Sequence, residues 1–145
     1  MSGHTTSLLT GLAELLAAHG HGVWRPGGAY NAGEVGITVA RKPDTPDDLI
    51  ALTPYDVDST SGTEDIVQGV QFWFRSGPDP RVVLDREDAV FELLHMREHF
   101  ALGGVHVNLA WRNSLATPAA DPRGRQELPA NYYLRTVRSA PHLIA

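Results

Sequence analysis

The feature that most restricts the fold is the alternation of side chains over residues 67–76. One set of positions holds Val70, Phe72 and Phe74, and the other holds Gln71, Trp73 and Arg75. Successive side chains of a strand point to opposite faces, so this pattern predicts a strand with one core face. The other face carries a tryptophan, which needs cover from a loop or from another subunit.

Two helices are expected to cover the core face. Leucines at helical spacing predict the first over about residues 7–19. Asp79 followed by Pro80 is a typical helix start, because aspartate caps free amides and proline at the first helical position loses no hydrogen bond. The second helix is therefore predicted over about residues 80–99, with Gly103 and Gly104 ending it.

Further strands are predicted over residues 35–40, 49–55, 105–112 and 132–138. Pro54, near the end of the predicted strand 49–55, has no N–H to donate. This end of the strand is therefore expected at a sheet edge or a bulge. Short connections between the last strands favour antiparallel pairing. We therefore predict a single α+β domain over residues 1–145, with a mainly antiparallel sheet of four to five strands and both helices packed on one face.

Three segments are expected to be loops: residues 25–34, which are rich in breakers, residues 56–65, which are acidic and rich in hydroxyls, and residues 117–131. The second has a single apolar residue, so we expect it to be mobile. In the third, Arg123 and Arg125 flank Gly124 and form a small cationic tip. Such a tip is either a solvated turn or a contact for an acidic neighbour.

Composition excludes several classes of protein. The 145 residues contain no cysteine, which excludes disulfides, a cysteine-ligated zinc site and a cysteine nucleophile. The formal net charge of −5 disfavours a dedicated nucleic-acid binder. No apolar run is long enough to span a membrane and no cationic leader precedes the first leucines, so we expect a soluble protein that stays where it is made.

One motif raises the alternative of a small histidine-ligated metal enzyme. Residues 95–99 match the pattern H-x-x-E-H, and two histidines four apart on a helix share a side. A third protein ligand is missing, since the only acids after His99 are Asp121 and Glu127, in a loop rich in proline and glycine. We therefore predict an exposed histidine pair, with no catalytic, cofactor-binding or metal-binding residue.

Four segments in order resemble the tail terminator proteins, also called minor capsid or tail-completion proteins, of long-tailed bacteriophages. The segments are residues 8–30, 33–57, 67–95 and 121–137. The resemblance implies a structural virion protein and not an enzyme. Such proteins form a ring, typically of six subunits, that caps the tail tube, stops its polymerisation and offers a docking surface to the head–tail connector. A head-closure or adaptor protein of the phage neck is the alternative within the same class.

The resemblance also implies partners and a location. The partners are further copies of the chain, the tail tube protein, the head–tail connector or stopper protein, and DNA as cargo crossing the lumen, at the head-proximal end of the tail. A closed head-to-tail ring uses two different patches on each subunit. Expected contact residues are Tyr30, Gln71, Trp73, Arg75, Arg123 and Arg125. Acids that could line the lumen and repel DNA are Asp44, Asp47, Asp48, Asp56, Asp58, Glu64 and Asp65.

Overall fold

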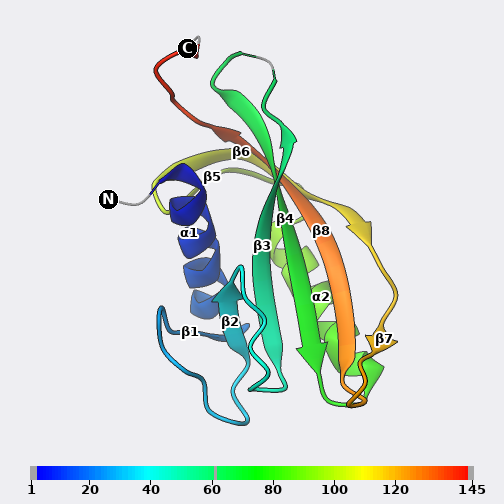
Figure 1. Cartoon of the computed structure of the whole chain (residues 1–145). Coiled ribbons are helices and arrows are strands. Elements are labelled where there is room, and N and C mark those ends of the chain that lie inside the picture. The colour runs from blue at the N-terminus through cyan, green and yellow to red at the C-terminus, as the bar shows by residue number, and fades with distance from the viewer. Residues whose placement is uncertain (1–2, 61, 144–145) are drawn as a thin grey trace.

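The computed structural model describes residues 3–60 and 62–143 and shows an α+β fold, as predicted (Figure 1). Helix α1 is followed by four strands, then by helix α2 and four more strands. The elements are α1 (His4–Ala18), β1 (Val23–Trp24), β2 (Gly36–Val39), β3 (Leu49–Asp58), β4 (Asp65–Ser76), α2 (Pro80–Leu94), β5 (Arg97–Leu102), β6 (Val105–Leu115), β7 (Ala119–Ala120) and β8 (Gln126–Val137).

The strands form one curled, mixed sheet of eight strands, which is larger than the predicted sheet of four to five. Its order is β1-β2-β3-β4-β8-β6-β5, and β7 pairs with β8 beside this path. The β1–β2 and β2–β3 pairs are parallel and the other pairs are antiparallel. The prediction missed β1 and β7 because each has only two residues, too few to show an alternation.

The second helix is shorter than predicted and ends at Leu94 instead of near His99. His95 is already extended, Met96 has φ 62°, and its N–H donates to the Ala110 carbonyl at 2.7 Å. The next residues form β5, with Phe100 packed against the core and Leu102 within it. Gly103 and Gly104 make the β5–β6 turn and do not end a helix. Pairing with β6 outweighs the helical spacing here.

The bounds of other elements also differ from the prediction. Helix α1 begins at His4, with Gly3 as its N-cap. The predicted loop 117–131 contains β7 and the first half of β8, since strand β8 begins at Gln126. The predicted loop 56–65 is the tip of a β3–β4 hairpin with longer arms. Pro54 lies beyond the residues that pair with β2, so it is on an unpaired edge of β3, as predicted.

Both helices pack on the core face. Helix α2 lies against β4, β8 and β6, whereas α1 contacts β1, β2 and β3 and also β5 and β6 (Figure 1). Because β1 and β5 are the two edges of the sheet, α1 closes the gap that the curled sheet leaves between them. Its approach is close at Gly11, where an added Cβ would lie 2.1 Å from the Gly103 nitrogen. Glycine is therefore required at this contact.

The predicted strand faces are confirmed. Val70, Phe72 and Phe74 are fully buried in the main core, whereas Trp73 belongs to a second, small cluster with Leu49 and Ala51. The Phe72 ring lies 4.8 Å from the ring of Tyr132 on β8. We call the side that carries Trp73 the outer face of the sheet.

A buried carboxylate lies in the core. The Glu87 carboxylate of α2 accepts from the Tyr132 hydroxyl at 2.8 Å and from Arg112 at 3.1 Å. Burial raises the pKa of Glu87, and the bonds from Tyr132 and Arg112 only partly oppose this effect. Burial and the bond to Glu87 also raise the pKa of Tyr132. The group thus ties α2 to β6 and β8 from inside.

Candidate assembly surface

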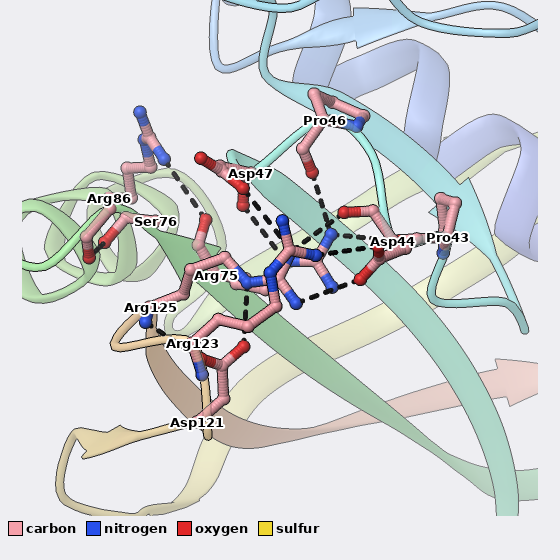
Figure 2. A network of polar contacts seen from close by, with 11 residues as sticks. Pro43, Asp44, Pro46, Asp47, Arg75, Ser76, Arg86, Asp121, Arg123 and Arg125 are labelled. Atoms are coloured by element: carbon pink, nitrogen blue, oxygen red, sulfur yellow. Dashed lines mark hydrogen bonds and ion pairs between the residues drawn. The ribbon is translucent and has the colours of Figure 1, made fainter.

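The loop over residues 40–48, between β2 and β3, folds across one end of the outer face and is held there by Arg75. This guanidinium donates to the carbonyl oxygens of Pro43 at 2.5 Å, Pro46 at 2.8 Å and Asp47 at 3.1 Å (Figure 2). Only 3% of Arg75 is exposed. Its predicted place on the outer face is correct, but all three bonds are made within its own chain.

A second arginine ties the same loop to the β7–β8 turn. Arg125 donates to Asp121 at 2.7 Å, to the Asp44 carbonyl at 2.8 Å and to the Asp44 carboxylate at 3.2 Å (Figure 2). At the rim, Arg123 pairs with Asp44 at 2.7 Å and Arg86 of α2 pairs with Asp48 at 2.8 Å. Loop 40–48 is therefore fixed from three elements, and we call this arrangement the arginine clamp.

The carboxylates of the clamp face arginines. Asp44, Asp47, Asp48 and Asp121 face Arg75, Arg86, Arg123 and Arg125. Arg123 and then Arg125 lower the pKa of Asp44. Burial pushes the pKa of Asp121 upward, but the bonds from Arg125 and from the backbone outweigh it, so this pKa is also below its usual value.

Replacing Asp121 with asparagine is expected to destabilise the protein at neutral pH. A carboxylate with a lowered pKa stabilises the fold above its unfolded pKa of about 4, and this contribution is lost as the pH falls through its folded pKa. The difference in unfolding free energy between wild type and Asp121→Asn should therefore be full above about pH 5 and shrink in acid. Urea unfolding at several pH values measures it, with Asp88→Asn on the exposed side of α2 as the control. A difference that does not vary with pH would contradict this role of Asp121.

The clamp also covers Trp73. The ammonium of Lys42 lies 4.5 Å from the centre of the indole ring and the Arg75 guanidinium lies 5.4 Å from it. Trp73 is 9% exposed, so the cover expected from its sequence comes from loop 40–48 of the same chain. Gln71 lies two residues before Trp73 on the same face of β4 and is half-buried.

Tyr30 is held apart from the clamp. Its hydroxyl donates to the Ile37 carbonyl at 2.5 Å and accepts from the Arg25 backbone at 3.1 Å. The side chain therefore fastens the loop of residues 25–35 onto β2, and 9% of it is exposed. Of the predicted contact residues, Arg123 at the rim of the clamp has an exposed side chain, at 59%.

The remaining predicted acids lie at the other end of β3, in the hairpin that projects beyond the sheet (Figure 1). Asp56 accepts from Ser59 at 3.0 Å, Asp58 accepts from Thr60 at 3.1 Å, and Glu64 accepts from Ser139. Asp65 is the first residue of β4 and pairs with Val137. In the part of the chain that the structure describes, no arginine or lysine forms an ion pair with Asp56, Asp58 or Glu64. In this respect Asp56, Asp58 and Glu64 differ from the acids of the clamp.

The structure also shows an aromatic row that the sequence did not predict. Tyr55, Gly69, Tyr133 and Trp111 occupy one cross-strand row of β3, β4, β8 and β6 on the outer face. Tyr133 meets Tyr55 edge-on at 6.5 Å and Trp111 at 5.7 Å. The Tyr55 ring occupies the space above Gly69, where a Cβ would lie 2.4 Å from it. All three aromatics remain half-exposed. The row could not be predicted, because a sequence pattern does not reveal the register in which strands pair.

The histidine motif does not form the arrangement that a helix would give. His95 is the C-cap of α2 and its ring nitrogen accepts from the Arg112 backbone at 3.1 Å, whereas His99 lies in β5. The expectation of two histidines on one side of a helix is therefore wrong. Within residues 3–60 and 62–143, no three His, Asp or Glu side chains are grouped as a metal site.

The outer face thus carries a clamped loop and a row of half-exposed aromatics, and aromatic side chains are enriched at protein–protein interfaces. A sequence model of the bacteriophage tail terminator protein family matches residues 15–138. The chain therefore belongs to the bacteriophage tail terminator family, as the resemblance implied.

The family places the protein in the virion, in association with other phage tail and head–tail proteins. No curated protein and no solved structure matches the chain. Neither helix among the described residues is long and apolar enough to cross a membrane.

Proposed function

We propose that the chain forms a ring, typically of six subunits, that caps the tail tube, ends its polymerisation and offers the docking surface for the head–tail connector or stopper protein. Family membership is the observation that carries this proposal. The role is structural and not enzymatic. It places the protein at the head-proximal end of the tail, with the tube protein on one side of the ring and the connector on the other.

The subunit contact is proposed on the uncovered part of the outer face. The sequence pointed to this face through Trp73 and Arg75, but loop 40–48 covers them. The aromatic row of Tyr55, Tyr133 and Trp111 lies on the same face beyond the loop. Half-exposed tyrosine and tryptophan rings that meet edge-on bury a large rigid area at little cost in entropy. A neighbouring subunit supplies the second, different patch that a head-to-tail ring requires.

The lumen is proposed to be lined by the β3–β4 hairpin. Both acidic segments were candidates, but Asp44, Asp47 and Asp48 are matched by arginines of the clamp. Asp56, Asp58 and Glu64 accept from hydroxyl groups instead and keep their charge. Such an acidic rim repels the phosphates of passing DNA over a Debye length of about 8–10 Å.

Virions that lack this polypeptide test the role in the neck. The expected result is tails of uncontrolled length that are not joined to filled heads. Tails of normal length joined to filled heads would exclude the proposal. Tails of normal length beside heads that have lost their DNA would indicate a head-closure or adaptor protein instead.

Replacing Trp111 with alanine is expected to leave the monomer folded and to weaken ring assembly by about 2 kcal/mol or more, which is roughly 30-fold in the association constant. Light scattering of the protein mixed with tail tubes, together with electron microscopy of tube ends, measures the effect. Leu84→Ala removes an exposed apolar side chain from α2, away from the outer face, and is the control. Rings that form equally well with both variants would move the contact away from the aromatic row.

A further inference from the structure

Two histidines meet on the exposed β5–β6 hairpin. Nδ1 of His99 lies 3.5 Å from Nε2 of His106, and the two rings are stacked with their centres 5.7 Å apart. Both side chains are exposed. His99 is the second histidine of the H-x-x-E-H motif, which begins at His95, but its partner in the structure comes from the next strand.

The register of the hairpin explains the pairing. His106 lies directly opposite Ala101, and His99 precedes Ala101 by two residues. Phe100 and Leu102 pack toward the core, so Ala101 and His106 opposite it point the other way, and the His99 ring stacks on His106 on that side. Diagonal neighbours of this kind are within reach of long side chains, and the small Ala101 leaves the His106 ring free to lean toward His99.

The backbone at His99 is a second observation at the same place. Its φ is 47°, in the left-handed region that side chains other than those of glycine, asparagine, aspartate and histidine seldom adopt. Histidine is one of the side chains that tolerate this region, and here the left-handed residue is the one whose ring nitrogen faces another ring nitrogen.

We propose that His99 and His106 form a two-nitrogen chelate for a divalent transition metal ion of the Zn²⁺ type. Two zinc–nitrogen bonds of about 2.0–2.1 Å at a tetrahedral angle hold their nitrogens about 3.3–3.4 Å apart. The observed separation of 3.5 Å is within a small ring rotation of that value. Imidazole nitrogens are ligands that suit zinc, copper and nickel.

The chelate leaves open coordination positions. No third His, Asp or Glu joins the pair among residues 3–60 and 62–143, so water completes the shell in the isolated chain. These positions are accessible to a donor group from another protein, because the site lies on an exposed hairpin at the edge of the sheet. Binding weakens in acid, since both ring nitrogens must be unprotonated to hold the ion.

Titration of the untagged protein with zinc chloride at pH 7.5 tests the site, by calorimetry and by histidine-ring NMR spectra. The expected result is one bound ion per chain with shifts confined to His99 and His106. His106→Asn is expected to weaken binding at least tenfold. His99→Asn should do the same, and asparagine tolerates the left-handed backbone at this position.

A matched control is the other stacked histidine pair. The rings of His19 and His21 lie 6.4 Å apart at the end of α1. His19→Asn should leave zinc affinity unchanged. Equal affinity of wild type, His99→Asn and His106→Asn, or no binding by the wild type at millimolar zinc, would overturn the proposal. The histidine pair shares no residue with the aromatic row or the acidic hairpin. The result of the zinc titration therefore does not affect the proposed ring function, which is tested separately.

Discussion

Replacing Phe72 with alanine is expected to destabilise the protein by about 3–5 kcal/mol, the usual cost of removing a large aromatic ring from a packed core. Phe72 is fully buried, and its ring lies between those of Tyr132 at 4.8 Å and Phe74 at 6.3 Å. Its removal therefore leaves a cavity between two central strands, β4 and β8, and the helix above them. Chemical denaturation followed by circular dichroism measures the change.

The adjacent residue supplies the control for Phe72. Gln71 belongs to the same strand but points to the outer face, where it is half-buried. Gln71→Ala is expected to change the unfolding free energy by no more than about 0.5 kcal/mol, as is usual for surface positions. Suppose that Phe72→Ala unfolded at the same denaturant concentration as wild type while Gln71→Ala did not. The assignment of the core face and the outer face of β4 would then be wrong.

Replacing Gly11 with alanine is expected to destabilise the protein by about 2–3 kcal/mol, a typical cost of overpacking. The new methyl carbon would lie 2.1 Å from the Gly103 nitrogen and 2.4 Å from the Leu102 carbonyl carbon. Both atoms belong to the backbone, so no side chain can turn away and the whole of α1 must shift. The same change in an exposed helix would instead stabilise it by roughly 1 kcal/mol.

The sign of this effect makes the test strict. A stabilised Gly11→Ala variant would show that α1 does not press against the β5–β6 turn and that the sheet is not closed by this helix. Thermal unfolding monitored by calorimetry distinguishes the outcomes. Glu14→Ala, at an exposed position of the same helix, is the control and is expected to have little effect.

The two acidic segments illustrate how far composition alone can be interpreted. Asp44, Asp47, Asp56 and Asp58 look alike in the sequence, and all were candidates to line the lumen. In the structure the first two meet Arg123 and Arg125, which are distant along the chain, whereas the last two accept from nearby serine and threonine residues. Local composition shows that a segment is charged, but only the folded chain shows which charges are neutralised.

The arginines show the same limit of local patterns. Arg75 was predicted as a contact with other chains from its place on the outer face, and Arg125 from its place in a cationic tip. In the structure each is buried under or beside loop 40–48, where backbone carbonyls and carboxylates satisfy its donors. Bonds between residues about 30 to 80 positions apart leave no trace in a local pattern.

The sequence by itself determined the strand over residues 67–76 and its core face, the start of α2 at Pro80, the edge position of Pro54 and the family, because periodicity, capping and proline chemistry act over a few residues. Tertiary structure alone decided that residues 97–102 form a strand, that loop 40–48 covers Trp73, that three aromatics share one row and that His99 meets His106. Those outcomes depend on register and on contacts between distant segments, and each is settled by the free energy of the whole sheet rather than by the preference of any one segment.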